Sequence, residues 1–295
     1  MNSPTRVVNH PPQLDPTAML EKYGPWAVIS GGTEGTGESF ARLLAEMGMN
    51  IMFVARRVDV MEALAEDLRT RHGIETRTLV QDLMEPDAAF NILEASKDLD
   101  VGLYISNAGV DGGPKRFLNQ KPERWVRFVT MNVTNVTVAA HGFGNRMRER
   151  GRGGILIMSS GSALVGHPYL ALYSATKAFD LALAEALWGE LAESNIDVTA
   201  IIAPTMTTPL VRKGLEEGTI KFDVVYECDD VARQSLAQLG HAPVLMFRSS
   251  SHESDPDKVV QGRYEHLLQL TETGKRHVGS GGRKPAHVAA ADANP

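Results

Sequence analysis

Residues 26–40 read WAVISGGTEGTGESF and pass from an apolar run through a glycine-rich turn into a helix-like segment. A helix that begins at such a turn points its free amide groups and the positive end of its dipole at the turn, where a phosphate can bind. Glycines there permit positive φ angles and let the backbone approach a pyrophosphate closely. The glycines and hydroxyl residues of the turn are Gly31, Gly35, Gly37, Ser30, Thr33 and Thr36. We predict a phosphate-binding turn, the alternative being a strand-to-helix connection that binds nothing.

Strand-like and helical patterns alternate along the rest of the chain. Apolar runs typical of strands cover residues 26–30, 50–55, 75–81, 101–106, 154–159, 197–203 and 242–247. Helical patterns lie between them, for example at residues 38–47, 58–71 and 177–193. Near-continuous apolar strands separated by amphipathic helices indicate a parallel sheet covered on both faces. We therefore predict an α/β protein with a single doubly wound, Rossmann-like domain, a parallel seven-stranded sheet, and ligands at the carboxyl ends of the strands.

The two ends of the chain differ in composition from the middle. Residues 1–20 are rich in proline, and residues 279–295 contain no aromatic side chain. Such compositions are typical of segments that form no packed core. We predict a flexible N-terminal arm over residues 1–22, a folded domain over 23–278 with a lid at about 205–226, and a flexible tail over 279–295.

The overall composition argues against several classes of partner. The net charge is −6 and no long basic run is present, so we expect no nucleic-acid partner. The single cysteine, Cys228, cannot form an internal disulfide and fits a reducing compartment. No apolar run is long enough to predict a membrane span, the N-terminus lacks a secretory signal, and no metal site is predicted. These features favour a cytoplasmic location.

Two arginines follow the second predicted strand, where dinucleotide-binding folds contact the adenosine ribose. An acidic residue there would bind the 2′-hydroxyl of NAD(H), whereas Ala55 offers no such group. Arg56 and Arg57 offer guanidinium groups suited to the 2′-phosphate of NADP(H). Glu34, in the glycine turn, would repel that phosphate unless it faces solvent or pairs with one of the arginines. We predict NADP(H) in preference to NAD(H), the alternative for the arginines being a solvated charge pair.

Two further strand ends bring small and polar residues to the same edge of the sheet. Asp82 follows the third strand and can accept a hydrogen bond from an adenine amino group, with Leu83 packed beside the ring. Alternatively, Asp82 caps the next turn. Asn107, Ala108 and Gly109 end the fourth strand, where small residues let the chain pass under a cofactor and Asn107 bridges neighbouring strands.

Residues 168–179, PYLALYSATKAF, hold a phenol and an ammonium about one helical turn apart. Tyr173 and Lys177 would project from the same helix face, and Ser160 ends the fifth strand at the same edge of the sheet. A phenol has a pKa of about 10, and a neighbouring ammonium and an oxidised nicotinamide stabilise its phenolate. Tyr173 can then exchange a proton with a substrate oxygen that Ser160 holds, while hydride moves to or from the nicotinamide.

Asn132 lies in a long helical segment after Trp125. Its amide can distort that helix and anchor a water that relays protons towards Lys177. The alternative is an ordinary polar residue of a helix.

Taken in order, these residues resemble the motifs of the short-chain dehydrogenase/reductase family. Over roughly residues 25–210, the motifs are Gly31/Gly35/Gly37, Asp82, Asn107-Ala108-Gly109, Asn132, Ser160 and the Tyr-Ser-Ala-Thr-Lys stretch at 173–177. The resemblance implies that Tyr173 is the general acid/base and that Lys177 assists it and binds the nicotinamide ribose. It also implies that Ser160 orients the substrate and that Asn132 completes a proton relay. Members of the family commonly pair through their long helices, so a homodimer or homotetramer is expected.

Within that family, the stretches AVISGGTEGTG and FVARR are similar to those of NADPH-dependent hydroxysteroid dehydrogenases and carbonyl reductases. One departure follows the sixth strand, where Pro204-Thr205 replaces the usual Pro-Gly. The resemblance still assigns Pro204 and Thr208 to the cofactor site, with Thr208 against the nicotinamide carboxamide. A second departure is the stretch MFRSSSHESDPDKVV, which stands where the family usually has glycines after the last strand.

The expected substrate is a small apolar alcohol or carbonyl compound. Leucine, valine, methionine and phenylalanine side chains in the 160–173 loop and in the lid predict an apolar pocket between these two segments. A catalytically idle nucleotide-binding sensor or interaction protein on the same fold is the alternative, although a sensor needs none of the residues Ser160, Tyr173 and Lys177. Epimerisation or dehydration on the same fold is a third option.

Overall fold

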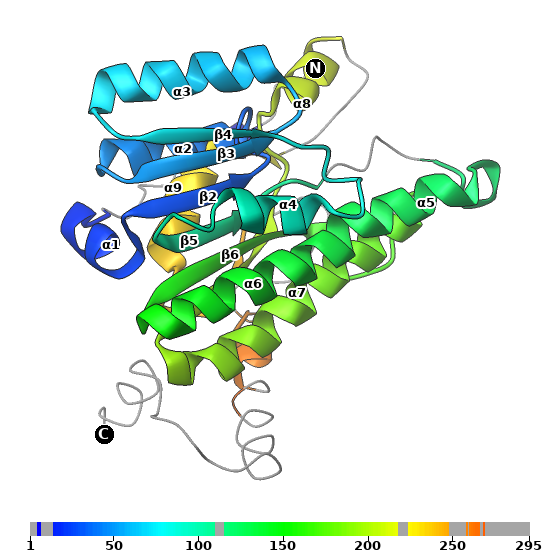
Figure 1. The fold of residues 1–295 in the computed structure, drawn as a ribbon. Helices are drawn as coiled ribbons and strands as arrows, with labels where there is room; N and C mark the ends of the chain where they lie inside the picture. Colours follow the sequence, from blue (N-terminus) through cyan, green and yellow to red (C-terminus); the bar gives the residue numbers. More distant parts are fainter. Residues whose placement is uncertain are drawn as a thin grey trace.

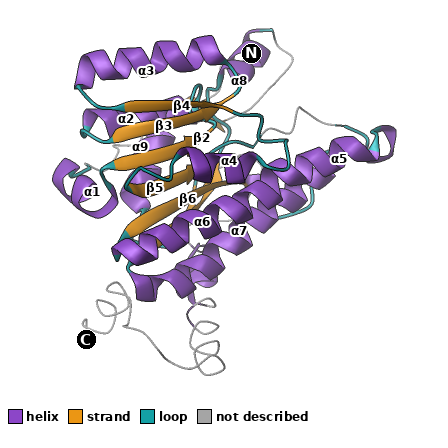
Figure 2. Ribbon diagram, in the orientation of Figure 1, coloured by secondary structure: helices purple, strands orange, loops and turns teal. Residues whose placement is uncertain are grey.

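A parallel sheet carries helices on both of its faces (Figure 1), and Figure 2 distinguishes the helices from the strands. The computed structural model describes residues 5–6, 14–109, 115–217, 224–247, 258, 260–265 and 268. Within these residues the sheet has seven strands in the order β4-β3-β2-β5-β6-β7-β9, and every neighbouring pair is parallel. The prediction of a doubly wound α/β fold with a seven-stranded parallel sheet is confirmed.

The strands and helices lie close to their predicted positions. The strands of the main sheet are β2 Trp26–Ser30, β3 Asn50–Ala55, β4 Thr76–Val80, β5 Val101–Ser106, β6 Gly153–Ser160, β7 Ile196–Ala203 and β9 Val244–Met246. The helices are α1 Pro16–Tyr23, α2 Thr36–Glu46, α3 Val58–His72, α4 Ala88–Ala95, α5 Pro122–Val129, α6 Asn135–Arg150, α7 Ala171–Leu191, α8 Pro209–Glu216 and α9 Cys228–Gln238. Helix α7 begins earlier than the predicted residue 177, so Tyr173 and Lys177 lie in one helix.

The order of the strands reverses between β2 and β5. The chain runs from β2 through β3 to β4 on one side and then returns to pair β5 with the other side of β2. The last residues of these two strands, Ser30 and Ser106, lie opposite each other. Ligands of open α/β sheets bind at such a point, outside the carboxyl ends of the strands.

Two apolar layers hold the helices on the sheet. One face of the sheet packs against α1, α2, α3 and α9, with Phe40 and Met61 fully buried. The other face packs against α4, α6 and α7, with Phe143 fully buried. Strands β2 and β5 are buried along their whole length, which explains why their sequences are apolar without alternation.

Helix α1 packs on the sheet, so the prediction of a flexible arm over residues 1–22 is wrong for this segment. Asp15 caps the helix by accepting hydrogen bonds from two amide groups of its first turn, and Pro16 stands at the first helical position. Met19 and Tyr23, four residues apart, bury one face of the helix. Burial raises the pKa of Tyr23, and its hydroxyl donates to Asp197 Oδ2 at 2.7 Å. The Asp-Pro cap and this spacing were visible in the sequence.

Parts of the arm and of the predicted lid form a second, two-stranded sheet. Strand β1 (Thr5–Arg6) pairs in parallel with β8 (Val224–Val225). The two ends of the lid are also tied together, because Met206 forms a bridge with Tyr226. Residues 218–223, the rest of the arm before Leu14, and the predicted tail at 279–295 lie outside the described residues.

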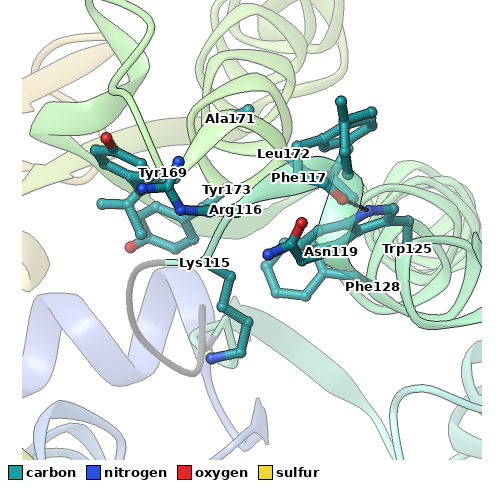
Figure 3. A pocket seen from close by; sticks show the side chains of 12 residues that line it. Lys115, Arg116, Phe117, Asn119, Trp125, Phe128, Tyr169, Ala171, Leu172 and Tyr173 are labelled. Atoms are coloured by element: carbon teal, nitrogen blue, oxygen red, sulfur yellow. Dashed lines mark hydrogen bonds between the residues drawn. The ribbon is translucent and has the colours of Figure 1, made fainter. Parts of the chain in front are cut away.

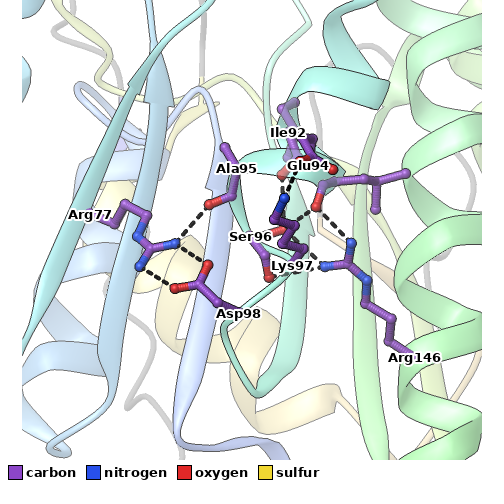
Figure 4. A network of polar contacts seen from close by, with 9 residues as sticks. Arg77, Ile92, Glu94, Ala95, Ser96, Lys97, Asp98 and Arg146 are labelled. Atoms are coloured by element: carbon purple, nitrogen blue, oxygen red, sulfur yellow. Dashed lines mark hydrogen bonds and ion pairs between the residues drawn. The ribbon is translucent and has the colours of Figure 1, made fainter.

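Two arginines bind the carboxyl end of α4 (Figure 4). Arg146, on α6, donates to Ser96 O at 3.0 Å, to Ser96 Oγ at 3.1 Å and to Leu93 O at 2.6 Å. Arg77, on β4, donates to Ala95 O at 2.8 Å and forms an ion pair with Asp98. The last carbonyl groups of a helix have no partner within the helix, so these arginines supply the missing donors.

Replacing Arg146 with methionine is expected to lower the free energy of unfolding by about 1–3 kcal/mol, because partly buried acceptors lose a charged donor. Urea denaturation measures the loss. Arg148→Met is the matched control on the same helix, because Arg148 is exposed and its side chain bonds, among the described residues, only to the nearby Asn145. It should change stability by less than about 0.5 kcal/mol. Equal losses in both variants would contradict the helix-capping role.

Candidate active site

The glycine turn brings backbone groups together too closely for side chains. A Cβ atom on Gly37 would lie 2.0 Å from Gly31 O and 2.8 Å from Asn107 Nδ2. Gly31 has a φ of +80° and Gly35 a φ of +58°, values that L-residues rarely adopt. Gly35 is the residue before α2, so the free amide groups of that helix begin at the turn. Backbone groups without side chains at a helix start fit the pyrophosphate of a dinucleotide.

The hydroxyl groups of this turn face the protein. Ser30 is buried, and its Oγ lies 3.4 Å from the hydroxyl of Tyr104. Thr36 Oγ1 donates to Met206 Sδ at 3.0 Å, and Thr33 is buried. Backbone amides are therefore the principal donors that the turn offers to a phosphate. The hydroxyls of Ser30 and Thr36, which were predicted to contribute, would first have to leave their present partners, Tyr104 and Met206.

Arg56 and Arg57 differ in their contacts. Arg57 forms an ion pair with Glu34, with 2.6 Å between Nη2 and Oε2. Glu34 is therefore compensated, which was the condition set by the sequence for NADP(H). Arg56 is exposed and has no ion pair or hydrogen bond with any residue in the part of the chain that the structure describes. Its guanidinium is open to an anion at the end of β3.

Asp82 makes protein contacts with both carboxylate oxygens. Oδ1 accepts a hydrogen bond from the amide of Met84 at 3.0 Å, and Oδ2 lies 3.1 Å from Arg127 Nη2. The capping role that the sequence left open is thus present. Leu83, half-buried, packs against the core, and its carbonyl accepts a hydrogen bond from Asn135.

The end of β5 supports the glycine turn. Asn107 Nδ2 donates to Gly31 O at 2.9 Å, and the amide of Ala108 donates to Ser30 O at 2.8 Å. A Cβ atom on Gly109 would lie 2.6 Å from Lys177 Nζ. The small residues at 108 and 109 therefore let this segment run between the turn and Lys177.

Lys177 contacts strand β6 near the carboxyl end at which Ser160 lies. Lys177 Nζ donates to Met158 O at 2.7 Å and to Asp180 Oδ2 at 2.9 Å. Ser160 is the last residue of β6, two residues beyond Met158, and its Oγ accepts from the amide of Ser162 at 3.2 Å. Tyr173 lies one turn before Lys177 on α7 and is half-buried.

Asn132 lies where α5 and α6 are joined by a wider turn. Residues Thr130–Thr134 form a π-helix, which bears out the expected distortion of the long helix. Asn132 is fully buried; its Nδ2 donates to Phe128 O at 3.2 Å, whereas its Oδ1 has no hydrogen-bond partner among the described residues. A buried acceptor without a partner fits an ordered water. A Cβ atom added to Gly109 would lie 3.2 Å from that Oδ1 and 2.6 Å from Lys177 Nζ, so both groups lie close to Gly109.

Tyr173 forms part of the wall of a cavity of about 300 Å³ (Figure 3). Aromatic and aliphatic side chains line most of it, and Trp125 stacks on Phe117 with ring centroids 5.4 Å apart. The other lining residues are Lys115, Arg116, Leu118, Asn119, Phe128, Tyr169, Leu170, Ala171 and Leu172.

The sequence placed the pocket between the 160–173 loop and the lid. Among the described residues, the end of that loop, 169–173, lines this cavity, and the wall opposite is formed by residues 115–119 and by α5. Residues 218–223 of the predicted lid lie outside the described residues. The wall opposite Tyr173 was hard to predict from the sequence, because residues 115–128 lie far from Tyr173 along the chain. Trp125 and Phe128, three residues apart on a helix, were the available signal.

The described part of the lid lies over the glycine turn. Thr208 caps α8, and its Cγ2 would lie 3.2 Å from a Cβ atom on Gly35. A cavity of about 540 Å³ lies between α2, α8 and α9, with Arg212 and Lys213 among its lining residues. Pro204 follows the end of β7, at the carboxyl edge of the sheet.

Cys228 also lines the cavity between α2, α8 and α9. Burial raises the pKa of its thiol, which argues against a reactive thiolate there.

A family model described as short chain dehydrogenase matches residues 25–218, most of the chain. The chain belongs to the short-chain dehydrogenase family. The matched range contains the glycine turn, Ser160, Tyr173 and Lys177, so this dehydrogenase is an oxidoreductase by family.

Similar proteins include both active and inactive relatives. A 7beta-hydroxysteroid dehydrogenase from Clostridium sardiniense is 33% identical over 252 residues, which cover 85% of this chain and 95% of the relative. The inactive hydroxysteroid dehydrogenase-like protein 1 from Homo sapiens is 33% identical over 197 residues, 65% of this chain and 60% of the relative.

Solved structures share the fold of this dehydrogenase. A short-chain dehydrogenase from Sphingobium yanoikuyae in complex with NADPH is 27% identical, with a TM-score of 0.71, and the match covers 83% of this chain and 96% of that one. The structure from a study of 7beta-hydroxysteroid dehydrogenase stereoselectivity has a TM-score of 0.72 at 24% identity, covering 83% of this chain and 98% of that one. None of the helices described for this dehydrogenase has the length and apolar character needed to span a bilayer.

Proposed function

We propose that this dehydrogenase transfers hydride between NADP(H) and an apolar secondary alcohol or ketone. The observation that carries the proposal is the position of Tyr173, which lines an aromatic cavity one helical turn from a buried lysine. Two further observations support the proposed set: Ser160 ends β6, and Asn132 Oδ1 and Lys177 Nζ both lie close to Gly109.

Each proposed residue has a distinct task. Tyr173 gives a proton to the carbonyl oxygen of a ketone, or takes one from an alcohol, and Ser160 donates a hydrogen bond to the same oxygen. The ammonium of Lys177 favours the phenolate form of Tyr173 and binds the ribose of the cofactor. Asn132 Oδ1 holds a water that returns protons towards Lys177. The nicotinamide, when bound, supplies the hydride chemistry.

The residues at the glycine turn fit the cofactor. Gly31, Gly35 and Gly37 leave the backbone free to approach a pyrophosphate, and Asn107 fixes the turn. Arg56 would bind the 2′-phosphate, with Arg57 neutralising Glu34 beside it. Asp82 and Leu83 would border the adenine, and Pro204 and Thr208 the nicotinamide. A relative of the same fold has been solved in complex with NADPH.

Replacing Arg56 with alanine is expected to weaken NADPH binding by about 10- to 100-fold and to leave NADH binding nearly unchanged. The lost interaction is a charged hydrogen bond to the 2′-phosphate, worth about 1.5–3 kcal/mol. Fluorescence titration with each cofactor measures both affinities.

Arg57→Ala is the matched control, because Arg57 is already paired with Glu34. It should weaken NADPH binding less than Arg56→Ala does. Equal losses for NADPH and NADH in Arg56→Ala would refute the 2′-phosphate assignment.

The cavity favours bulky apolar substrates. Its aromatic walls, with Phe117, Trp125 and Phe128, suit a flat hydrocarbon body whose oxygen reaches Tyr173. A relative is named for its action on a hydroxysteroid, so fused-ring alcohols and ketones are the first compounds to test.

The test is a panel of ketones and secondary alcohols, with NADPH or NADP⁺, followed by nicotinamide absorbance. Turnover of bulky apolar compounds supports the proposal. Firm cofactor binding without turnover across the panel would instead support an idle nucleotide-binding protein, the alternative that the inactive human relative keeps open. A homodimer or homotetramer stays a prediction that light scattering of the same preparation can test.

A further inference from the structure

A second buried acid–base contact lies behind the proposed catalytic set. Asp180, on α7, is 1% exposed, and Lys177 is 3% exposed. Asp180 Oδ2 accepts a hydrogen bond from Lys177 Nζ at 2.9 Å, whereas Asp180 Oδ1 is buried and has no hydrogen-bond partner among the described residues. Charged residues are almost never this deeply buried unless they are paired. The pairing with Lys177 therefore accounts for the burial of Asp180, and the question is what this buried pair does for the site.

The surroundings contain few other charges. Tyr104 on β5 is the titratable group from the sheet that feels the charge of Asp180. Strand β6 contributes only the carbonyl of Met158 and the hydroxyl of Ser159, and the one acid of β7, Asp197, binds Tyr23 on α1 instead. From the π-helix comes the neutral Asn132, and from α7 itself Tyr173.

Burial and pairing act on Asp180 in opposite directions. Burial raises the pKa of the carboxyl, and the charge of Lys177 partly offsets that rise. The pair is costly to separate, because removing one member leaves an uncompensated charge in a dry site.

We propose that Asp180 is the positioning residue and counter-ion of Lys177, and that it thereby sets the pH range in which Tyr173 exchanges its proton. This inference rests on the proposed function of Tyr173 and Lys177. Two of the three N–H groups of the lysine are committed to Met158 O and Asp180 Oδ2. The ammonium also lies against the backbone of Gly109, beside the acceptor of Asn132. Asp180 thus holds one proton of the ammonium, and the third N–H group has no hydrogen-bond partner among the described residues.

The charge of Asp180 has a definite sign at the site. A carboxylate favours the protonated form of every titratable neighbour, so it opposes the effect of the ammonium on the nearby phenol. Removing that charge while keeping the size of the side chain leaves the ammonium of Lys177 unopposed, and this unopposed positive charge makes proton loss from the phenol easier. The pH dependence of alcohol oxidation should therefore move to lower pH.

The test is Asp180→Asn, studied in the full chain with NADP⁺ and an alcohol that the wild type oxidises. We expect the pH of half-maximal kcat to fall by about one unit or more. We also expect the maximal kcat to fall by about 10-fold, with little change in KM, as for groups that orient an essential side chain. Glu185→Gln is the matched control, because Glu185 lies on the same helix as Asp180 and forms an ion pair with Arg263. Breaking that ion pair should leave the pH profile unchanged.

A second readout separates this inference from the proposed function, because it needs no turnover. The ultraviolet absorbance of tyrosinate is titrated with pH in the wild type and in Asp180→Asn, and the signal that disappears in Tyr173→Phe is assigned to Tyr173. Its midpoint should lie at lower pH in Asp180→Asn, even if no substrate is found. An unchanged midpoint and an unchanged pH profile in a folded Asp180→Asn protein would overturn the inference.

Should Asp180→Asn fail to fold, Asp180→Glu keeps the charge and answers the same question. The wild-type pH profile with a lower kcat would support the counter-ion role. A shifted profile with the charge retained would overturn it.

Discussion

Replacing Tyr173 with phenylalanine is expected to lower kcat by about 10²–10⁴, the usual contribution of a positioned acid/base. The ring would still fill the wall of the aromatic cavity, so substrate and NADPH should bind nearly as before. What disappears is the only group proposed to exchange a proton with the substrate oxygen. Steady-state kinetics with a ketone found in the panel, together with NADPH titration, separates these effects, because kcat falls while the affinities stay.

Tyr169→Phe is the matched control for this change. Tyr169 lines the same cavity and carries the same phenol, but it lies under Arg116, with 5.6 Å between Cζ and the ring centroid, and is more than half exposed. Its replacement should alter kcat by no more than a few-fold. Near-normal turnover by Tyr173→Phe would remove Tyr173 from the mechanism, whatever the control does.

Gly37→Ala should have the second large effect, on cofactor binding and on stability. The new methyl group would lie 2.0 Å from Gly31 O, a backbone atom that cannot move without displacing the glycine turn. Forcing a group into such a packed position commonly costs about 1–3 kcal/mol. A displacement of about 1 Å can cost a further 10²-fold in the function of the site. NADPH titration and thermal unfolding of the variant measure the two losses.

Gly262→Ala is the control for an alanine placed in a helix. Gly262 lies in the helical residues 260–265 and is exposed, and a Cβ atom on it would meet no atom of the described residues within 4 Å apart from its own helix backbone and chain neighbours. Its replacement should leave NADPH binding unchanged and raise stability slightly, because alanine is the better helix former. Unchanged NADPH affinity in Gly37→Ala would show that the turn does not approach the cofactor.

The parts of the site that the sequence predicted depend on short spacings. The run from β2 through the glycine turn into α2 is continuous, so residues 26–40 were enough to locate it. Tyr173 and Lys177 share one helix, and Ser160 ends a strand whose apolar pattern is plain. For Asn132 the sequence suggested a distortion of its helix, with an ordinary helical residue as the alternative, and the structure has a π-helix there.

The sequence also misjudged some segments. Helix α1 was assigned to a flexible arm, because the prolines before it outweighed a cap and two apolar residues. The lid was predicted to face the 160–173 loop, whereas the wall described opposite Tyr173 is formed by residues 115–119 and α5, which were not predicted to line it. The error at α1 concerns where the segment packs, and not its composition.

The sequence by itself determined the order of strands and helices and the strand ends at which a phenol, an ammonium and a serine hydroxyl would appear. Apolar periodicity and turn glycines act between residues a few positions apart, so they can be recognised without a fold. Only the tertiary structure decided that Arg57 neutralises Glu34, that Trp125 faces the cavity of Tyr173, and that Arg127 pairs with Asp82. These contacts join residues far apart in the chain, and they exist because burying both faces of the sheet brings distant segments to the same edge.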